Sequence, residues 1–145
     1  MTVKKIENTT AYEFIDKHHF ELMLNRLEYY NGEGNYYKFW KDKYIYYGVF
    51  DSNKLVAIQI VVPNFDGWSY EKNKISGSCR LVVLQKISGT KHGVFKTVLD
   101  YFEPLYKNKY IYLEVYVDKL KKMYESLGFE KVFKNNEHMY KKFIY

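Results

Sequence analysis

Tyr124-Glu125-Ser126-Leu127-Gly128-Phe129-Glu130 is the stretch of this chain that decides its fold. These residues predict the end of a short helix, a turn at Gly128, and the beginning of a strand. Helices often end on a glycine, because the left-handed conformation at that position costs any other residue more. The large side chains of Tyr124, Leu127 and Phe129 would supply the hydrophobic contact that accompanies such an end. A packed helix end with no chemical role also fits these seven residues.

The length and composition indicate one folded domain that spans residues 1–145. With 145 residues, 47% of them hydrophobic, the chain is long enough to bury a core and too short to divide into domains. No apolar run approaches the ~20 residues that are needed to cross a bilayer. The first residues, Met1–Lys5, have no apolar signal core behind them. We therefore expect a cytoplasmic protein without a membrane partner, either a monomer or a homodimer.

Cysteine and histidine usage argues against a metal site. Cys79 is the single cysteine, which excludes an intrachain disulfide and a zinc site built from cysteines. It lies in an apolar run, so a buried structural thiol is expected rather than a nucleophile. The four histidines lack the spacing of metal ligands; they are His18, His19, His92 and His138.

The chain is basic, with a formal net charge of +6 and 23 Lys and Arg residues. Nucleic acid or an anionic cofactor could exploit this charge. Only a few of the basic residues are arginines, which are the residues that grip phosphates with a planar fork. A lysine-rich solvated surface is therefore the default interpretation, and nucleic acid stays a candidate partner.

Apolar periodicity and turn residues predict strands and helices along the whole chain. A capping box from Thr10 to Glu13 is expected to start the first helix. Asp51-Ser52-Asn53-Lys54 predicts a hairpin between the strands on either side of it. Leu120, Met123 and Leu127 are expected to face inward from the last helix. The aromatic cluster over 36–40 has no partner that the sequence identifies. The expected strands are 3–7, 44–50, 55–62, 77–84, 110–116, 131–133 and 138–144, and the expected helices are 10–18, 20–30, 92–106 and 118–126.

The string Y-E-S-L-G-F at 124–129, in this order of elements, resembles the GCN5-related N-acetyltransferases, the GNAT superfamily. The stretch at 46–57, Y-Y-G-V-F-D-S-N-K-L-V-A, is similar to the second and third strands of that family. The resemblance implies an α+β fold, an α/β sandwich in which about four helices flank a mixed, mostly antiparallel, twisted sheet of six or seven strands. It also implies an N-acetyltransferase that moves an acetyl group from acetyl-CoA to an amine of a protein or small molecule by direct attack.

The resemblance gives Tyr124 a catalytic role. In that family the tyrosine hydroxyl lies near the thioester sulfur and can protonate the departing thiolate. A phenol titrates near ~10, so it is protonated at neutral pH and can donate.

A cofactor site is expected around Gly93. A strand, a short turn and a helix form an anion site from physics alone, because the first amides of a helix have no partner within it and its dipole favours negative charge. The resemblance places the pyrophosphate of coenzyme A here, on a Q/R-x-x-G-x-G/A segment whose first glycine matches Gly93. Phe95 departs from this pattern, because it stands where glycine or alanine is expected and its ring could obstruct the pyrophosphate.

The cofactor residues implied by the resemblance lie on a strand and on the turn that follows it. Backbone groups of the strand would meet the pantetheine arm and the thioester carbonyl, and the turn would hold the phosphates. Lys86, Lys91 and Lys96 surround the turn and are candidates to meet those phosphates, although a solvated lysine-rich turn fits as well. Thr90 or His92 could simply cap the helix. The implied residues are Leu81, Val82 and Val83 on the strand, and Lys91, His92, Gly93, Val94 and Phe95 at the turn.

The base that would deprotonate the acceptor amine has several candidates. Glu114, within a predicted strand, is the first of them, and an outward-facing carboxylate with no role is its alternative. Glu21 and Glu28 on the predicted second helix are further candidates. The sequence assigns no partner to Arg80.

A narrower resemblance is to small GNAT-like proteins of bacteriophages and mobile elements, some of them related to proteins that modify adenine in DNA. A-Y-E-F-I-D-K-H-H at 11–19 carries it. Three hypotheses follow: an N-acetyltransferase, a GNAT-like protein that acts on or binds nucleic acid, and a non-catalytic interaction protein, which Phe95 favours. In the second, lysines would neutralise phosphates and aromatic rings would stack on bases. The first hypothesis is our prediction.

Overall fold

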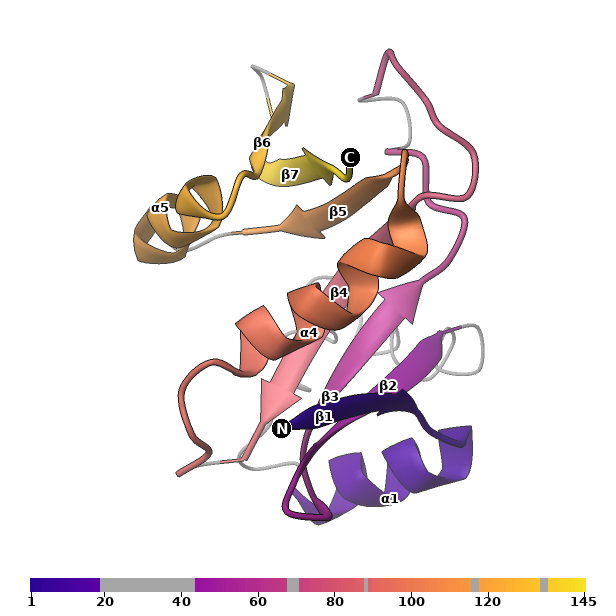
Figure 1. Cartoon of the computed structure of the whole chain (residues 1–145), viewed down its shortest axis with the longest axis vertical. Coiled ribbons are helices and arrows are strands. Elements are labelled where there is room, and N and C mark those ends of the chain that lie inside the picture. The colour runs from indigo at the N-terminus through magenta and orange to yellow at the C-terminus, as the bar shows by residue number, and fades with distance from the viewer. Residues whose placement is uncertain (19–43, 68–70, 88, 116–117, 134–135) are drawn as a thin grey trace, which may run out of the picture. The chain divides into compact units, whose positions relative to one another are not determined.

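The computed structural model describes residues 1–18, 44–67, 71–87, 89–115, 118–133 and 136–145. Within these residues, seven strands form a mixed sheet in the order β1-β2-β3-β4-β5-β7-β6 (Figure 1). β4 pairs with β5 in parallel, and β1–β2, β2–β3, β5–β7 and β6–β7 are antiparallel. The predicted α+β fold with a mostly antiparallel sheet is therefore confirmed. The elements are β1 Thr2–Lys5, α1 Asn8–Lys17, β2 Ile45–Asp51, β3 Lys54–Val62, β4 Cys79–Lys86, α4 Val94–Phe102, the 3-10 helix η3 Glu103–Tyr106, β5 Tyr110–Glu114, α5 Asp118–Ser126, β6 Glu130–Phe133 and β7 Asn136–Phe143.

Two compact units make up the chain. The first unit contains residues 1–61 and 83–101, and the second contains residues 62–82 and 102–145. The predicted helix over 20–30 and the aromatic cluster over 36–40 lie outside the described residues. Within those residues, no helix combines the length and the apolar character needed to span a bilayer.

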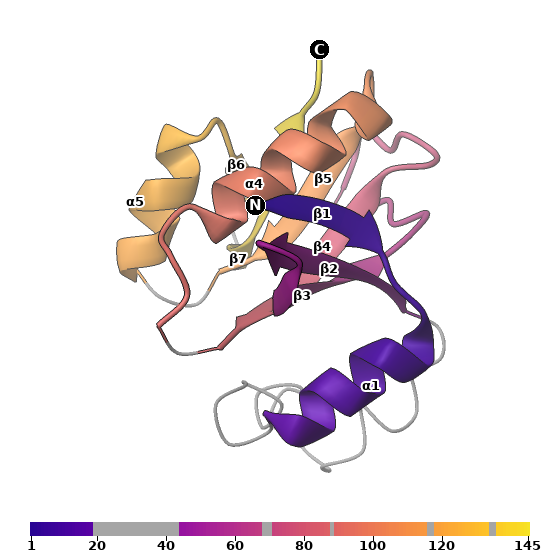
Figure 2. The same ribbon diagram turned by 60° about the horizontal axis from the view of Figure 1, so that its bottom comes forward.

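The first unit packs helices on both sides of its strands. In Figure 2, α1 lies below strands β1–β3 and α4 lies above them. On the α1 side, the rings of Tyr12 and Tyr46 meet edge to face with centroids 5.7 Å apart. On the α4 side, Tyr47 and Tyr101 have ring centroids 5.7 Å apart. Consecutive residues of one strand, Tyr46 and Tyr47, thus pack on opposite faces of the sheet.

The hairpin that joins β2 and β3 is the one that the sequence predicts. Ser52 and Asn53 form its two-residue turn with φ angles of 51° and 67°. Positive φ at both central positions belongs to a type I′ turn, whose twist matches that of the strands. Asn tolerates this conformation better than most residues do.

The predicted capping box at the start of the first helix is wrong. α1 begins at Asn8, so Thr10 and Glu13 lie inside it, and Glu7 takes the N-cap position without a side-chain cap. The Ala11 amide already donates to the Glu7 carbonyl at 3.1 Å. The chain turns into the helix early because β1 ends at Lys5, two residues before the predicted end of that strand.

The helix predicted over 92–106 is divided. α4 ends at Phe102, and η3 follows with Pro104 near its start. Proline has no amide hydrogen and clashes with the preceding turn, so it cannot continue an α-helix. The apolar spacing of α4 is confirmed, since Val94, Val98, Leu99 and Phe102 are buried.

The second unit contains the stretch that decided the fold. Gly128 has φ 97°. Its amide donates to the Glu125 carbonyl at 3.0 Å, and the Phe129 amide donates to the Tyr124 carbonyl at 3.1 Å. The rings of Tyr124 and Phe129 meet edge to face at 6.0 Å. These two bonds and this contact define a Schellman motif, so the predicted glycine helix end is confirmed.

Gly128→Ala is expected to lower the free energy of unfolding by about 1–2 kcal/mol, because alanine is strained in the left-handed region. The added Cβ would also meet Lys142 Cε at 3.1 Å. Urea denaturation measures the loss. Gly128→Asn should cost less, since asparagine is the next residue that this position accepts. Equal stability of the alanine variant and the wild type would contradict the assignment.

The predicted inward orientation of Leu120 and Met123 is wrong. Their exposed fractions are 37% and 39%, and no residue of α5 is buried. The side chain of Lys121 is instead only 15% exposed. One turn later Tyr124 is half-buried, so the inward face of α5 runs through Lys121 and Tyr124. A lysine can take such a position because its long stem packs while its ammonium reaches out.

Cys79 is buried, as predicted. Burial raises the pKa of its thiol to about 12, with a hydrogen bond to Tyr106 acting against that rise. We expect alkylation of the native protein at pH 8 to be at least about 10³-fold slower than in urea, because the thiolate fraction is smaller and the sulfur is covered. Mass spectrometry after timed iodoacetamide labelling tests this. Comparable rates in both states would contradict a structural thiol.

Candidate functional site

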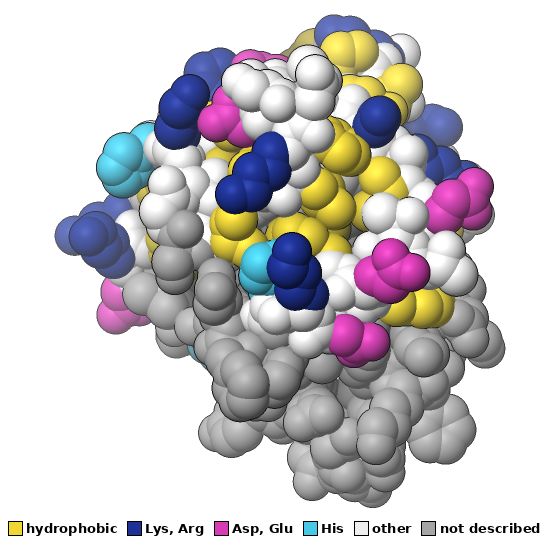
Figure 3. Space-filling view, turned by 90° about the horizontal axis from the view of Figure 1, so that it is seen from below, with side chains coloured by type: hydrophobic (Ala, Val, Ile, Leu, Met, Phe, Trp, Pro, Cys, Tyr) yellow, Lys and Arg dark blue, Asp and Glu magenta, His cyan; other side chains and the backbone are white. Residues whose placement is uncertain are grey.

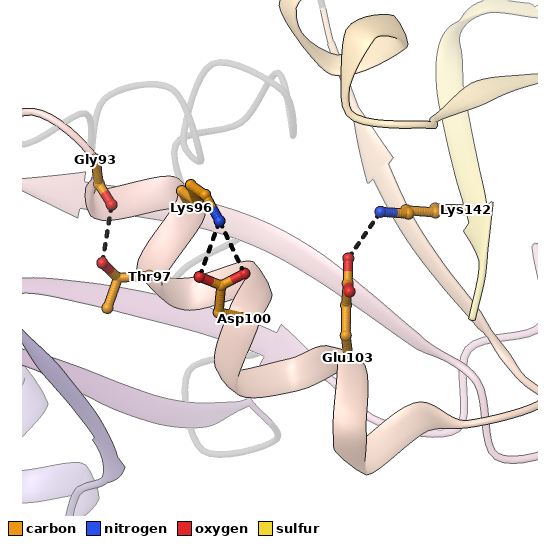
Figure 4. A network of polar contacts seen from close by, with 6 residues as sticks. All are labelled: Gly93, Lys96, Thr97, Asp100, Glu103 and Lys142. Carbon is orange, nitrogen blue, oxygen red and sulfur yellow. Dashed lines mark hydrogen bonds and ion pairs between the residues drawn. The ribbon is translucent and has the colours of Figure 1, made fainter. Parts of the chain in front are cut away.

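The turn before α4 is built from short local hydrogen bonds. The Ile87 amide donates to the Val56 carbonyl at 3.1 Å, which ties the end of β4 to β3. The Thr90 hydroxyl donates to the Ile87 carbonyl at 2.6 Å, within the turn. At the helix start, the amide and hydroxyl of Thr97 donate to the Gly93 carbonyl at 3.0 Å and 2.9 Å (Figure 4). Gly93 is therefore the residue immediately before α4, and its carbonyl accepts the first hydrogen bond of the helix.

Two glycines leave room at this turn. Gly89 and Gly93 have φ angles of 80° and 90°. A Cβ placed on either would have no heavy atom within 4 Å, so space is open beside both. The first amides of α4, those of Val94, Phe95 and Lys96, have no acceptor within the helix by its geometry. Open space beside donors at a positive helix end fits an anion such as a phosphate.

Exposed lysines stand around the same turn. Lys91 lies 3.4 Å from the carboxylate of Asp51, at the end of β2. Lys96 pairs with Asp100 at 3.1 Å, one turn along α4 (Figure 4). Such exposed pairs contribute only about 0–1 kcal/mol, so a ligand phosphate can compete for either lysine. On the face that Figure 3 shows, Lys and Arg side chains are scattered among acidic and hydrophobic ones.

The predicted cofactor residues of the turn differ in exposure. His92 and Gly93 are exposed, whereas Val94 is buried and belongs to the core of the first unit. Phe95 is half-buried, so part of its ring faces solvent in the first turn of α4. No atom of this ring lies within 4 Å of a Cβ placed on Gly93, so the ring does not fill the space beside that glycine.

The parallel ladder between β4 and β5 is short. It comprises Cys79–Ile111, Arg80–Tyr112 and Leu81–Leu113, whereas β4 continues to Lys86. We call the place where this ladder ends, after Leu81 and Leu113, the fork. Beyond the fork, within the described residues, the backbone N–H and C=O groups on the β5 side of β4 are not paired in this ladder.

Tyr124 lies in the second unit, in the last turn of α5. Burial raises the pKa of its phenol above the usual value. The Schellman motif fixes its backbone, and the ring of Phe129 packs against its own. The hydroxyl therefore keeps its proton at neutral and moderately alkaline pH, as a proton donor must.

Glu114 and Arg80 form an ion pair at the fork. The guanidinium nitrogen of Arg80 lies 2.6 Å from a carboxylate oxygen of Glu114, and both side chains are largely shielded from solvent. The guanidinium carbon also stands 5.6 Å from the ring centroid of Phe65. The partner of Arg80 that the sequence did not assign is thus Glu114.

A buried polar cluster was missed by the sequence analysis. The side chain of Glu71, in the segment between β3 and β4, is only 3% exposed, and that of Lys141, on β7, is 9% exposed. Oxygen Oε2 of Glu71 accepts hydrogen bonds from Lys141 Nζ at 2.7 Å and from Tyr112 Oη at 2.8 Å. The backbone amide of Asn73 donates to Oε1 at 3.0 Å. In sequence these residues are too far apart for any local pattern to link them.

The pKa values in this cluster follow its geometry. Burial by itself raises the pKa of Glu71, but hydrogen bonds from Lys141, the Asn73 amide and Tyr112 outweigh it, and the pKa is lowered overall. Burial, and then the carboxylate of Glu71, raise the pKa of Tyr112. Glu71 is therefore charged, Tyr112 is neutral, and Lys141 supplies the compensating charge.

The predicted site residues fall in both units. The turn residues Lys91, His92, Gly93, Val94 and Phe95 belong to the first unit, as does Val83. The strand residues Leu81 and Val82, together with Glu114 and Tyr124, belong to the second. Within the described residues, no group of His, Cys, Asp and Glu has the arrangement of a metal site.

Comparison with known proteins identifies the fold. No protein-family profile matches the chain, and no curated protein sequence does. Solved structures do match over nearly the full length. A histone acetyltransferase HPA2 and related acetyltransferase from Corynebacterium glutamicum has a TM-score of 0.64 at 14% identity, with 99% of this chain and 96% of that chain covered.

Two further structures agree. The AtaT–AtaR complex bound to DNA has a TM-score of 0.61 at 14% identity, with coverage of 97% of this chain and 93% of that chain. Aminoglycoside 6′-acetyltransferase type Ii has a TM-score of 0.59 at 14% identity, with coverage of 100% and 98%. Identities this low establish a shared fold alone. The chain therefore has the fold of the GCN5-related N-acetyltransferases.

Proposed function

We propose that this protein is an N-acetyltransferase that moves an acetyl group from acetyl-CoA to an amine of a protein or small molecule. The observation that carries the proposal is Tyr124, whose hydroxyl is held in its protonated form at a fixed helix end in a GNAT fold. The open anion site beside Gly93 supports it. Both features were predicted from the sequence, and their local geometry supports the proposal.

Two segments would hold acetyl-CoA. The amides at the start of α4 and the exposed lysines Lys86, Lys91 and Lys96 would meet its phosphates. Backbone groups of Leu81, Val82 and Val83 would meet the pantetheine arm and the thioester carbonyl at the fork. When bound, acetyl-CoA supplies an acetyl group activated as a thioester.

The protein's own residues would move the protons. Tyr124 would donate its phenolic proton to the leaving sulfur, a role that suits a tyrosine whose pKa is raised by burial. Glu114 is the candidate that would take the proton of the acceptor amine. Its carboxylate is paired with Arg80 at 2.6 Å, which holds the side chain in place at the fork.

The test is the melting temperature with and without acetyl-CoA. At about 100-fold excess over Kd, binding adds about 2.7 kcal/mol, which for a chain of this size raises Tm by roughly 5–10 °C. Wild type should show this rise, and the isolated nucleotide half of the cofactor should give part of it. If acetyl-CoA shifts Tm in neither the wild type nor Phe95→Gly, the proposal is wrong.

Phe95 decides between this proposal and a non-catalytic interaction protein. If its ring closes the phosphate site, wild type will show no rise in Tm while Phe95→Gly will show one. The fold would then be retained without the activity. Because the ring is half-buried, we expect wild type to bind and Phe95→Gly to bind no more than a few fold more tightly.

A second candidate is a protein that acts on or binds nucleic acid. The formal net charge of +6 favours it. One of the matched structures is a complex bound to DNA, although the match itself shows only the fold. Retention on immobilised DNA that falls steeply between 50 and 200 mM salt would support this candidate. The narrower phage-type assignment stays a hypothesis.

A further inference from the structure

We infer that Glu71 is a positioning residue that fixes the fork between β4 and β5 through Lys141 and Tyr112. The inference rests on the proposed function, because the fork is where the pantetheine arm would bind. Glu71 itself cannot meet a substrate, since its side chain is only 3% exposed. Glu71 can therefore act only through the residues that it contacts.

The cluster lies on a row of residues that crosses three strands. Arg80 of β4 pairs with Tyr112 of β5, and Tyr112 pairs with Lys141 of β7. Paired residues of a sheet point to the same face, so the three side chains stand on one face in a line. Glu71 binds two members of this row, at 2.8 Å and 2.7 Å. One carboxylate thus links the segment before β4 to two neighbouring strands.

The row lies next to the fork. Only one residue pair, Leu81–Leu113, separates it from the end of the parallel ladder. Ladders this short offer few backbone hydrogen bonds, so side chains must contribute to the register at their end. On this face the cluster of Glu71 lies beside the Arg80–Glu114 ion pair, since Arg80 is the neighbour of Tyr112 in the row.

The segment before β4 is fastened to the same place at three further points. The Phe65 amide donates to the Ser78 carbonyl at 2.7 Å. The Ser78 hydroxyl accepts from the Tyr110 amide at 3.0 Å. Gly67 has φ 88°, and a Cβ there would lie 2.6 Å from the Cβ of Glu71, so only glycine permits this close approach. The described parts of this segment therefore bring a carboxylate over the row.

A second ion pair on the same strand provides a matched control. Lys142, the next residue on β7, points to the opposite face and binds Glu103 at 2.7 Å (Figure 4). Both pairs involve a lysine of β7, have the same length, and lie in the second unit. Only the Glu71 pair lies on the face with Arg80 and Tyr112.

The experiment compares three double variants by their Kd for coenzyme A, measured calorimetrically on the folded protein. Glu71→Leu/Lys141→Met removes every polar link and keeps the buried volume. Glu71→Gln/Lys141→Met removes the charges but keeps an acceptor oxygen for the Asn73 amide, and its NH2 group can donate to the hydroxyl oxygen of Tyr112. Glu103→Leu/Lys142→Met is the control. We expect the first to raise Kd about tenfold, and the other two to stay within about twofold of wild type.

A second probe separates positioning from general loss of structure. The nucleotide half of the cofactor, 3′-phosphoadenosine 5′-diphosphate, lacks the pantetheine arm and needs only the turn before α4. Its Kd should be unchanged in Glu71→Leu/Lys141→Met. Equal weakening of both probes, or unchanged affinity for coenzyme A, would overturn the inference.

Amide hydrogen exchange distinguishes failure of this inference from failure of the proposed function. Peptides that cover 79–83 should exchange at least about tenfold faster in Glu71→Leu/Lys141→Met than in wild type and in the glutamine variant. If wild type does not bind coenzyme A but this acceleration is seen, the positioning role stands and the acetyltransferase proposal falls. If exchange in 79–83 is unchanged, the positioning role is wrong.

Discussion

Tyr124→Phe is expected to lower kcat about 10²-fold and to leave the KM for acetyl-CoA within about twofold of wild type. General acid catalysis by a placed side chain contributes about 10²–10⁴-fold, and phenylalanine keeps the ring while removing the proton donor. The packing against Phe129, at 6.0 Å between centroids, should survive the change. The measurement is the release of free thiol from acetyl-CoA with an amine acceptor that a screen of amines has identified.

The matched control for this variant is Tyr110→Phe. Tyr110 is also a half-buried tyrosine of the second unit, and its ring, not its hydroxyl, faces Lys141 at 4.4 Å. Its kcat should equal that of wild type. Burial raises the pKa of Tyr124, so its hydroxyl should stay protonated up to about pH 10. Below that pH, the wild-type rate should not decline through loss of this proton. An unchanged kcat in Tyr124→Phe would remove the observation that carries the proposed function.

Glu71→Ala is expected to lower the free energy of unfolding by about 3–5 kcal/mol. The variant leaves the ammonium of Lys141 buried without its carboxylate, and breaking one side of a buried ion pair costs about this much. Glu71→Leu/Lys141→Met should recover most of the loss, because no charge is then buried. Glu103→Ala, which breaks a more exposed pair, should cost about 1 kcal/mol or less. Urea denaturation at pH 7 compares the four proteins.

The contribution of Glu71 should also depend on pH with a definite sign. Its pKa in the folded protein is lowered from the ordinary value of 4.5. The stabilisation is therefore fully present above about pH 4.5 and is lost as the pH falls through the folded-state pKa. Wild type should lose more stability on acidification below pH 4.5 than Glu71→Leu/Lys141→Met does. Parallel acid profiles of the two proteins would contradict a charged, paired Glu71.

Local sequence signals were sufficient where the conformation of an element depends mainly on its own residues. Gly128 predicted a helix end, and the two hydrogen bonds of a Schellman motif are there. The turn between β2 and β3 was predicted from Asp51-Ser52-Asn53-Lys54, and both central residues have positive φ. These signals survive because backbone conformation at a turn depends mainly on the residues within it.

Rotation and long-range pairing could not be predicted in the same way. Leu120 and Met123 have helical spacing, but a helix rotated toward Lys121 satisfies nearly the same pattern. Glu71 and Lys141 are 70 residues apart, and neither stands in a context that distinguishes it from a surface residue. Arg80 and Glu114 likewise meet only because β4 and β5 are neighbours in the sheet. The sequence contains one hint of the buried cluster: Gly67 lies close to Glu71 in the chain, and a glycine is needed where the backbone comes this near to a side chain.

The division of the chain into two compact units has a consequence for experiments with fragments. The first unit takes residues from both sides of residues 62–82, and the second takes residues from both sides of residues 83–101. Neither is a contiguous segment, so no single cut in the polypeptide separates them. A fragment that ends after β3 lacks α4 and with it one covering layer of its own strands. The same applies during synthesis on the ribosome, because the first unit cannot complete its fold until residue 101 has left the ribosome.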